Sequence, residues 1–550
     1  MMMGQVVCVG QAGNWVWARQ AGGTHAQEGY SCATDAAGNV YATGYFEDST
    51  ITFGTITLHS NGSIGNQEMF LVKYSPTGIV EWAISAAGSC ISTGTSVATD
   101  LFGNVYLTGS FQGTFILGSY TLTCLSYQDV YIAKFSSTGT VLWAQCGMGS
   151  YSSYGYSVAT DPSGNAILVG IYQGATINFG TYTLTLSGGI VDVFTVSYSP
   201  SGVVQWAKTA GGIGGCQIAD VATDASGNIY ISGSFESPYV TFDTDTLTSA
   251  GSSDIYIVKY SSTGTVIWAK RAGGTSWDGG ASVITDYTGN IYVTGCFISP
   301  TISFGVNTFV NQGAGQADVF ITKYSAAGNV VVAKSAGSSF PVVGYSLASS
   351  VTGTNNAIGI YLTGSFYGPS IIFDTDTLIH QPLTFDPMFI VKYDENLNVI
   401  CATFLESGGD DNNAIATDNF GNAYIAGDFA VNPFIVGTDS FTLTGTELFF
   451  VAKYNCSGTT VSNSEIRNPN FEITIYPNPA TNNLTITFAE PQKNTTIKIL
   501  NLLGETVNSE QLIVNSKSAT IDVSDVAQGM YFVQITDETK NSITKKIIVQ

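Results

Sequence analysis

The stretch "GNWVWARQAGG" at residues 13–23 decides the fold, because near-copies of it recur along the chain. These copies are "TVLWAQCG" at 140–147, "VVQWAKTAGG" at 203–212 and "TVIWAKRAGG" at 265–274. Each later copy closes a longer repeat, whereas the first stands close to the start of the chain. The sequence therefore begins with the last segment of its own repeating unit.

One complete repeat reads "SVATDLFGNVYLTGSF" (96–111), "FILGSYTLT" (115–123) and "DVYIAKFSSTGTVLWAQ" (129–145). A degenerate copy, "SLASSVTGTNNAIGIYLTGSF", occupies 346–366. With it the chain holds seven units of roughly 61–66 residues, and self-similarity at a fixed period is the sequence signature of a repeat fold. The Asp of the "ATD" element recurs in six of these units, at Asp35, Asp100, Asp161, Asp224, Asp286 and Asp418.

Each unit predicts β-strands separated by tight turns. "SVATD" and "VYLTGSF" flank an Asp-x-x-Gly-Asn turn, and "DVYIAKF" and "TVLWAQ" flank Ser-Ser-Thr-Gly. The "FILGSYTLT" segment predicts an additional hairpin. The main strands are rich in Val, Ile, Tyr and Phe and are apolar on both faces, as expected for sheets that pack face to face.

Four main strands per unit and no helical pattern predict an all-β fold, a seven-bladed β-propeller, with a solenoid as the alternative. The seventh unit lacks its own aromatic-Ala strand after Cys456. Trp15, Trp17 and Ala18 supply that strand from the N-terminus, so we expect them to complete the last blade and close the ring. The other six units carry this position at Trp82, Trp143, Trp206, Trp268, Val332 and Cys401.

The 550 residues are 44% apolar and only 11% charged, and the formal net charge is −22. Binding to nucleic acid requires clustered Lys and Arg. All the basic residues of the repeats except Arg271 instead recur at two repeat positions, so no nucleic-acid partner is expected. No apolar stretch approaches the ~18–20 residues that span a bilayer, so no membrane span is expected either. The recurring basic residues are Lys73, Lys134, Lys259, Lys323, Lys392 and Lys453 in the third strand, and Arg19, Lys208, Lys270 and Lys334 in the fourth.

The "ATD" Asp and the third-strand Lys do not always occur together. The third unit keeps Asp161 but has Ser197 in place of Lys, and the sixth keeps Lys392 without the Asp. An obligatory buried ion pair would lose both partners together, because a lone buried charge is costly. We therefore expect each Asp to cap its own turn.

No motif for catalysis or cofactor binding is present: the sequence lacks GxSxG, HExxH, a P-loop and a GxGxxG after a strand. His25, His59 and His380 fall outside the recurring positions and are expected at the surface. The nine cysteines are scattered singly without metal-ligand spacing. Most are expected to act as small buried apolar residues, and their odd number argues against a full disulfide framework.

Two acidic pairs are weak candidates for a metal site. "FDTDTLT" occurs twice and gives Asp243 with Asp245 and Asp374 with Asp376. Alternate residues of a strand point to one side, so each pair could offer oxygens to a hard cation. Calcium requires 6–8 oxygen ligands, however, so a solvated hairpin is the competing interpretation.

Aromatic residues in the connecting segments could stack on sugars. Tyr151, Tyr154 and Trp277 are the candidates, and packing at the inner rim is the alternative. A glycosidase with two carboxylates from different blades also stays open, because the sequence does not set their ~5–9 Å separation.

The repeats end near residue 457, and a polar linker (458–470) leads to a C-terminal segment (471–550) that predicts a small β-sandwich. Its motifs are "YPNPATNNLTI" (476–486), "KILNLLGETV" (498–507), "IDVSDVAQGMYFVQI" (521–535) and "KKIIVQ" (545–550). They resemble the type A C-terminal sorting domain of the type IX secretion system of Gram-negative bacteria, an Ig-like sandwich. The matching residues are Pro477, Asn478, Pro479, Gly504, Gly529, Tyr531, Lys545 and Lys546.

This resemblance implies export across both membranes, with the secretion machinery and its sortase as partners. It also implies removal of the domain, followed by attachment to surface lipopolysaccharide or by release. Residues 1–12 lack a basic start and are interpreted as the remnant of an export signal. Localisation is therefore expected to be extracellular, at the cell surface.

The repeat region (13–457) resembles the bacterial SBBP-type β-propeller family, through "GNVYLTGSF", "DVYIAKFSSTG" and "WAK…AGG". Propellers host both enzymes and binding modules, so this resemblance implies a fold and not a reaction. We expect an adhesin-like module for an extracellular glycan or protein, without a cofactor. An extracellular polysaccharide hydrolase or lyase and a purely structural surface protein are the alternatives.

Overall fold

The computed structural model describes residues 7–9, 13–60, 65–236, 238–313, 315–352, 357–374, 376–380, 386–408, 413–456, 473–477, 480–492, 495–500, 506–512, 516–536 and 542–549. Every regular element in these ranges is a β-strand, which confirms the predicted all-β class. The chain forms two compact units, residues 1–458 (unit 1) and 459–550 (unit 2). A search of these described ranges finds no helix able to cross a membrane.

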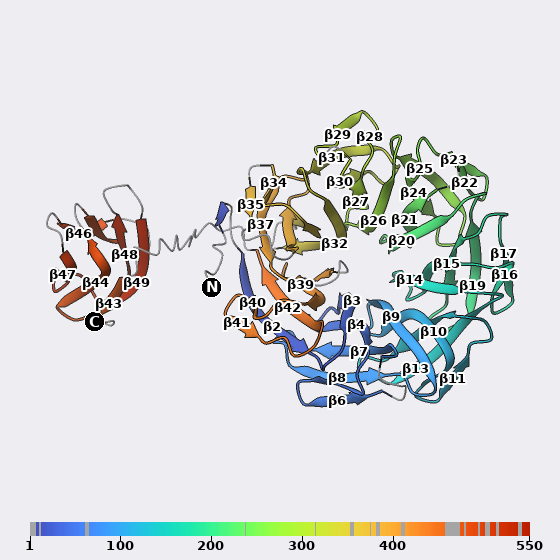
Figure 1. The fold of residues 1–550 in the computed structure, drawn as a ribbon, viewed down its shortest axis with the longest axis horizontal. Coiled ribbons are helices and arrows are strands. Elements are labelled where there is room, and N and C mark those ends of the chain that lie inside the picture. The colour runs from blue at the N-terminus through green and yellow to red at the C-terminus, as the bar shows by residue number, and fades with distance from the viewer. Residues whose placement is uncertain are drawn as a thin grey trace. The chain divides into compact units, whose positions relative to one another are not determined.

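Among the described residues, unit 1 contains seven groups of four antiparallel strands, which lie side by side in a ring (Figure 1). We number them sheets 1 to 7 in the chain order of their first strands. The first strands lie nearest the centre and are β3 (Gln27–Thr34), β9 (Cys90–Thr99), β14 (Ser153–Thr160), β20 (Cys216–Thr223), β26 (Asp278–Thr285), β32 (Val342–Thr352) and β38 (Ala414–Thr417).

Three further strands follow outward in each sheet. The second strands are β4 (Val40–Phe46), β10 (Val105–Leu117), β15 (Ala166–Tyr172), β21 (Ile229–Phe235), β27 (Ile291–Phe297), β33 (Ala357–Phe366) and β39 (Ala423–Phe429). The third strands are β7 (Glu68–Tyr74), β12 (Asp129–Phe135), β18 (Asp192–Tyr198), β24 (Asp254–Tyr260), β30 (Asp318–Tyr324), β36 (Met388–Tyr393) and β42 (Leu448–Asn455). The fourth strands are β8 (Val80–Ser85), β13 (Val141–Gly149), β19 (Val204–Ala210), β25 (Val266–Ala272), β31 (Val330–Ala336), β37 (Val399–Leu405) and, in sheet 7, β2 (Asn14–Ala21).

A short hairpin lies between the second and third strands of each repeat. In sheet 2 it is formed by the end of β10 with β11 (Tyr120–Thr123), and β13 also pairs with β16, so this sheet grows to seven strands. The other hairpins are β5 (Thr50–Phe53) with β6 (Ile56–His59), β16 (Thr176–Phe179) with β17 (Tyr182–Thr185), β22 (Tyr239–Phe242) with β23 (Asp245–Thr248), β28 (Thr301–Phe304) with β29 (Asn307–Val310), β34 (Ser370–Phe373) with β35 (Asp376–Ile379), and β40 (Phe434–Val436) with β41 (Asp439–Phe441).

The second and third strands form the core of the ring. In sheets 1, 3, 4 and 5 every residue of these strands is buried, on both faces. This burial follows from the position of each sheet between two neighbours, so that both faces of a strand contact another apolar surface. One apolar cluster joins Val40 and Phe70 of sheet 1 to Tyr424 and Phe449 of sheet 7.

The N-terminal strand β2 pairs antiparallel with β42, with Asn14 opposite Asn455 and Ala21 opposite Phe449. Trp17 and Ala18 are buried, and the Trp15 ring lies 5.0 Å from the ring of Tyr454. Sheet 7 therefore combines three strands from the end of the repeat region with one from its beginning. Val7–Val9 forms β1, which pairs with β35, and the other residues of 1–12 lie outside the described ranges.

Each "ATD" Asp caps its own turn, as the sequence predicts. In sheet 2, one Asp100 oxygen accepts hydrogen bonds from the amides of Phe102 and Asn104, and the other accepts from the Asn104 side chain. The Lys134 ammonium lies 3.3 Å from the same carboxylate and also donates to the Pro200 carbonyl of the next sheet. The Lys thus has a second acceptor, which explains why a unit can lose the Asp and keep the Lys.

The fourth-strand Trp of one sheet binds the turn of the next. The indole N–H of Trp143 donates to Pro200 O at 3.0 Å, and that of Trp82 donates to Ser137 O at 3.1 Å. The N-terminal Trp17 makes the same contact with sheet 1, donating to Pro76 O at 3.1 Å. The residue at the chain's start therefore links sheet 7 to sheet 1 as the internal repeats link their neighbours.

Unit 2 consists of two antiparallel sheets around one apolar cluster that includes Leu484, Ile499 and Val533. One sheet has the order β43-β44-β47 and the other β46-β45-β48-β49. Their bounds are β43 (Ile473–Tyr476), β44 (Asn483–Gln492), β45 (Thr495–Leu500), β46 (Thr506–Leu512), β47 (Ser516–Asp522), β48 (Gly529–Thr536) and β49 (Ser542–Val549).

Candidate functional site

A cavity of about 910 Å³ lies on the axis of unit 1, and the first strands of all seven sheets contribute to its wall. We call it the axial channel. Its wall mixes hydroxyl, amide and aromatic groups with small apolar side chains. A concave site of this size with a few converging polar groups is the usual form of a ligand site, so the channel is the candidate functional site of this protein.

A β-bulge recurs in the first strand of sheets 1 to 6 and shapes the channel wall. In sheet 3, Gly155 pairs with Gly170 and Ser157 with Val169, which leaves Tyr156 as the extra residue. A bulge redirects a side chain from the ladder, and here the redirected residues line the channel. The channel-lining bulge residues are Tyr30, Thr95, Tyr156, Ala219, Ala281 and Tyr345.

The bulge explains the glycine of the "LTGSF" element. A Cβ placed on Gly170 would overlap the backbone oxygen of Tyr154 in the bulged strand. The equivalent Gly44 faces the Glu28 oxygen, and Gly295 faces the Gly279 oxygen, in the same way. The recurring glycine therefore leaves room for the backbone of the recurring bulge, and the bulge directs a side chain into the channel.

A belt of hydroxyl groups follows the bulge residues along the channel. The residue after each bulge is Ser in five sheets, and four of these serines accept from the backbone of the next sheet, as Ser31 accepts from Val97 N at 3.1 Å. Sheet 4 has Asp220 instead. Its carboxylate accepts from the hydroxyls of Ser157 and Ser282, both at 2.7 Å, and from the amides of Val221 and Val283.

Asp220 is the one acidic residue among the described residues of the channel wall. Burial raises the pKa of Asp220 above its ordinary value, against the hydrogen bonds from Ser157 and Ser282, which lower it. Four donors occupy the acceptor positions of the two oxygens, so this carboxylate is held as a structural link between sheets 3, 4 and 5.

Cys32 also lines the channel, and burial raises the pKa of its thiol to about 12, which makes it a poor nucleophile.

A second set of hydrogen bonds surrounds the far end of the channel. A hydroxyl residue at or near the end of each first strand donates to the backbone oxygen of the preceding sheet, at 2.6–3.0 Å. The donors are Thr34, Thr99, Thr160, Thr223, Thr285, Ser349 and Thr417. Each acceptor is the donor residue of the neighbouring sheet, so the bonds form one closed cycle.

The channel mouth carries a carboxylate held by two phenols. Glu28 is buried and accepts hydrogen bonds from Tyr30 at 2.9 Å and from Tyr45. Burial, the Glu28 charge and these bonds raise the pKa of both tyrosines, so both phenols stay protonated. Glu47 lies in the same cluster, and burial and the Glu28 charge raise its pKa as well.

The three aromatic candidates differ in their positions relative to the channel. Tyr154 lines the channel, and the exposed Tyr151 stacks on the exposed Tyr127 with centroids 6.1 Å apart and planes at 19°. The bulge residue Tyr156 follows two positions after Tyr154 and is 40% exposed. Tyr127, Tyr151, Tyr154 and Tyr156 form what we call the tyrosine track. Trp277 is 38% exposed and lies in another sheet connection.

The acidic pairs lie on the outer hairpins, away from the channel wall. Asp243 accepts from Lys208 of the preceding sheet at 3.0 Å, and Asp374 accepts from Lys334 at 2.9 Å. Both have positive φ, at the position where other hairpins carry Gly. Asp245 and Asp376 begin the following strands, and no cluster of three or more His, Cys, Asp or Glu suited to a metal occurs among the described residues.

The sorting-motif residues fall in unit 2. Pro477 lies just after β43, Gly529 and Tyr531 lie on β48, and Lys545 and Lys546 lie on β49. Asn478, Pro479 and Gly504 lie outside the described residues.

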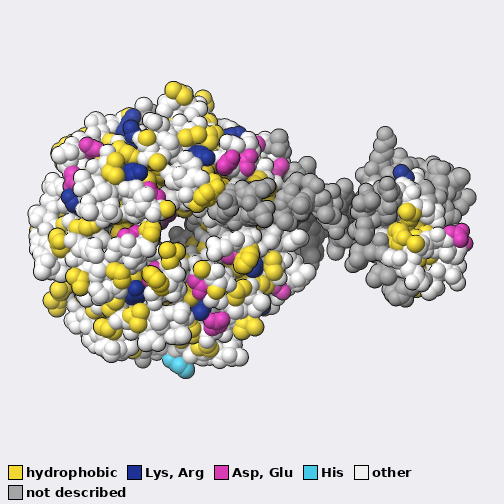
Figure 2. All heavy atoms as spheres, turned by 180° about the vertical axis from the view of Figure 1, so that it is seen from behind, with side chains coloured by type: hydrophobic (Ala, Val, Ile, Leu, Met, Phe, Trp, Pro, Cys, Tyr) yellow, Lys and Arg dark blue, Asp and Glu magenta, His cyan; other side chains and the backbone are white. Residues whose placement is uncertain are grey.

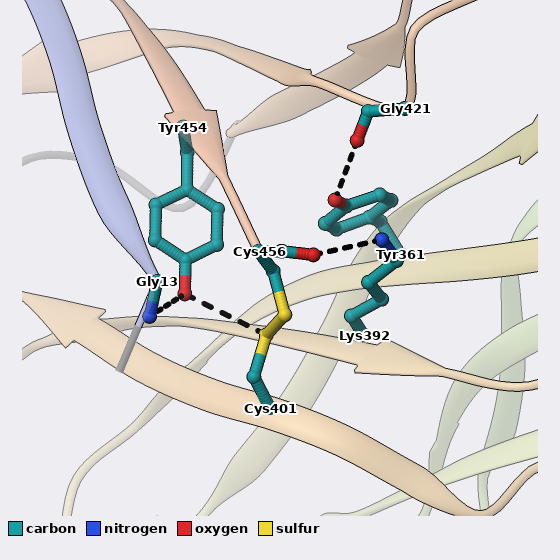
Figure 3. Close-up of a disulfide and its surroundings, with 7 residues drawn as sticks. All are labelled: Gly13, Tyr361, Lys392, Cys401, Gly421, Tyr454 and Cys456. Atoms are coloured by element: carbon teal, nitrogen blue, oxygen red, sulfur yellow. Dashed lines mark hydrogen bonds between the residues drawn. A yellow bond between two sulfur atoms is a disulfide. The ribbon is translucent and has the colours of Figure 1, made fainter. Parts of the chain in front are cut away.

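One disulfide joins the last two sheets within the described residues (Figure 3). Cys401 on β37 is bonded to Cys456, which directly follows β42, and both are buried. Around it, Gly13 N donates to the Tyr454 hydroxyl at 3.1 Å, and the Lys392 ammonium donates to Cys456 O at 3.0 Å. The sequence gives no signal for this bond, because Cys401 stands at an apolar repeat position.

The histidine prediction was wrong for one residue. His25 and His59 are exposed, but His380 is only 2% exposed and its ring lies 5.9 Å from that of Phe404 and 6.3 Å from that of Phe366. Burial lowers the pKa of His380. The position follows from the outer hairpin, because His380 comes directly after its last strand β35 and packs there against Phe366 and Phe404 of sheet 6.

Basic side chains do not gather around the channel. Figure 2 shows them as isolated spots on the surface of unit 1, among hydrophobic and acidic groups. No Lys, Arg or His belongs to the described channel wall.

One curated protein resembles a large part of this chain. Over 392 residues, this chain is 27% identical to an uncharacterized WD repeat-containing protein of Acanthamoeba polyphaga mimivirus. The match covers 58% of this chain and 28% of that protein. This chain thus spans under a third of that relative's length.

Among solved structures, PorZ of Porphyromonas gingivalis, described as a bacterial surface component of the type IX secretion system, is similar with 11% identity and a TM-score of 0.20, over 96% of this chain and 100% of PorZ. A gluconolactonase of Xanthomonas campestris is similar with 9% identity and a TM-score of 0.28, over 68% of this chain and 99% of that one.

Residues 474–550 match the family of secretion system C-terminal sorting domains. The protein is accordingly secreted through the type IX secretion system to the cell surface.

Proposed function

We propose that unit 1 is a seven-bladed β-propeller of the SBBP type, closed by β2, which binds an extracellular glycan in its axial channel at the cell surface. The observation that carries the binding role is the channel wall, where bulges direct Tyr30, Tyr156 and Tyr345 into a cavity of about 910 Å³. Aromatic faces with hydroxyl and amide groups beside them are suited to sugars, which present both C–H faces and hydroxyls.

Binding is favoured over polysaccharide hydrolysis by the state of the carboxylates. Glycoside hydrolysis commonly uses two carboxyl groups on either side of the scissile bond. The described channel wall offers Asp220, whose oxygens are occupied by four donors, and Glu28 near the mouth is buried beneath two phenols. Neither of these two groups is free to approach a glycosidic oxygen, and Glu47 beside Glu28 is then a single carboxyl group where hydrolysis commonly uses two.

For the sorting unit, we propose that the sortase removes it and that the propeller then stays attached to surface lipopolysaccharide. The match of residues 474–550 to the sorting family supports a contact with the secretion machinery. Deleting residues 471–550 should hold the protein in the periplasm, and fractionation of the cells would measure this.

The binding proposal is tested with the purified full chain on a glycan array, with a product assay on the same glycans. We expect retention on a defined set of glycans without release of shorter products. Release of shorter products would show that unit 1 is an enzyme and would overturn the binding proposal. No retention on the array and no product would favour a structural role.

A further inference from the structure

We infer that the axial channel takes a neutral, hydroxyl-rich glycan and excludes polyanionic ones such as uronate- or sulfate-rich chains. This inference rests on the proposed binding function and deepens it by naming the ligand class. It follows from the positions of the charges in unit 1, from the chemistry of the channel wall and from the tyrosine track.

All but Lys270 of the basic side chains of unit 1 are engaged away from the channel, and Lys270 does not belong to the described channel wall. Within the described repeats, ion pairs or backbone oxygens hold ten of them, and none of these partners belongs to the channel wall. The ten are Arg19, Lys73, Lys134, Lys208, Lys259, Arg271, Lys323, Lys334, Lys392 and Lys453.

The charges near the channel are negative. Asp220 lies in the wall, and Glu28 and Glu47 lie at the mouth beside Tyr30. A sulfate or carboxylate entering the channel would lose water without gaining a cationic partner, and it would face these carboxylates and the −22 net charge of the chain. An uncharged sugar avoids both costs, because its hydroxyls exchange water for protein hydrogen bonds.

The wall supplies the partners that an uncharged sugar requires. Tyr156 offers a 40% exposed ring, and the Gln128 amide, bonded to the Ser110 hydroxyl at 2.6 Å, lies on the same wall. The bulge residues of sheets 4 and 5 are the small Ala219 and Ala281, whereas the bulge residue of sheet 1 is the larger Tyr30. The channel wall is therefore recessed at sheets 4 and 5 and carries an aromatic bulge residue at sheets 1, 3 and 6.

The tyrosine track runs from the channel wall to exposed tyrosines outside that wall. Tyr151 and Tyr156 are five residue steps apart, which is at most about 17 Å in an extended chain. The exposed pair Tyr127 and Tyr151 lies at its outer end and Tyr156 at its inner end. This arrangement is suited to a glycan chain whose end enters the channel while its next residues stack along the mouth.

The test titrates the full chain with three neutral polysaccharides (mannan, xylan and dextran) and three anionic ones (alginate, polygalacturonate and heparin), by calorimetry at low and high salt. We expect binding to at least one neutral polymer, with an affinity that salt leaves unchanged, because no ion pair is formed. Tyr156→Ala should weaken this binding about tenfold. Tyr287→Ala, which removes an exposed ring from a turn outside the channel wall, should leave it unchanged.

A second variant keeps the test decisive if Tyr156→Ala does not fold. Ala281→Trp fills the recessed wall and should also abolish binding of the neutral polymer. Salt-sensitive binding of an anionic polymer that Tyr156→Ala removes would overturn the ligand class and leave the proposed function standing. Binding unaffected by both channel variants would overturn the channel as the site, and no binding of any polymer would overturn the proposed function itself.

Discussion

The hydroxyl of Thr34 donates a 2.7 Å hydrogen bond to the backbone oxygen of Thr417, a residue 383 positions later in the chain. Thr417 in turn donates to Ser349 O at 2.6 Å, and the cycle continues through every sheet back to Thr99, which donates to Thr34 O at 2.7 Å. The bond that joins the two ends of the repeat region is thus the same bond that joins internal neighbours. The ends of unit 1 are held by repeat-type contacts at the axis, and by β2 at the periphery.

Removing β2 should cost far more stability than removing the residues before it. Deletion of residues 1–20 takes away the partner strand of β42 and buried Trp17 and Ala18, and loss of a buried Trp alone costs about 3–5 kcal/mol. Deletion of residues 1–12 leaves β2 intact and should lower the melting temperature only slightly. Thermal unfolding of both truncated chains measures the difference, and equal melting temperatures would contradict the role given to β2.

Substituting the glycine opposite the bulge should disrupt the channel wall. In Gly170→Ala the new methyl group would overlap the Tyr154 backbone oxygen, which cannot move without displacing the bulge at Tyr156. We expect a loss of about 1–3 kcal/mol in the free energy of unfolding. Gly215→Ala is the matched control, because the nearest atom to its Cβ is 3.9 Å away. Denaturant titration compares the two variants, and equal losses would refute this account of the glycine.

Two buried carboxylates should respond to pH in opposite directions. Burial raises the pKa of Asp318 to about 6, so the folded state binds its proton more tightly than the unfolded state. The stability contributed by this group therefore falls as pH rises from about 4 to 6. Asp318→Asn removes this dependence, so the melting temperature of the variant relative to the wild type should rise across that interval.

Asp286 supplies the opposite case. Its burial raises the pKa, but hydrogen bonds from Thr288 and Asn290 outweigh burial, and the pKa is lowered overall. Its stabilising contribution is present above the unfolded pKa of about 4 and is lost as pH falls below it. Asp286→Asn should therefore cost most at neutral pH and least near pH 3. Melting curves of both variants from pH 3 to 7 provide the measurement, and parallel trends would contradict the assignment.

The repeat pattern predicts strands, turns and the partner of β2, because each of these follows from residues at fixed positions in every unit. Trp17 could be assigned by counting its six counterparts. The bulge at Tyr156 could not, because the pattern of apolar residues does not distinguish an extra residue from an ordinary one. The recurring Gly170 position was the available signal, and Asp220 was visible only as an exception at a position that is Ser in five units.

The disulfide and the buried histidine escaped prediction for a different reason. Cys401 and Cys456 are 55 residues apart, and their contact depends on how sheet 6 packs against sheet 7. His380 follows an exposed-looking hairpin whose end lies against Phe366 and Phe404. Packing between separate strands and sheets sets both positions. The repeat pattern indicates which strands form within one sheet, but it does not indicate which residues of neighbouring elements come into contact.

The Cys401–Cys456 disulfide should protect the end of unit 1 against unfolding from the C-terminus. Asn14 at the start of β2 lies opposite Asn455 at the end of β42, so force applied to the two ends would break the hydrogen bonds of this pair one at a time. The disulfide ties Cys456 to β37 of the neighbouring sheet instead.

For a loop of 55 residues, the entropy of the unfolded chain predicts that the disulfide contributes about 4 kcal/mol to the free energy of unfolding. Reduction with dithiothreitol should therefore lower the melting temperature of the wild type and leave the double variant Cys401→Ser, Cys456→Ser unchanged. A wild-type melting temperature that does not respond to the reductant would show that the bond adds no stability.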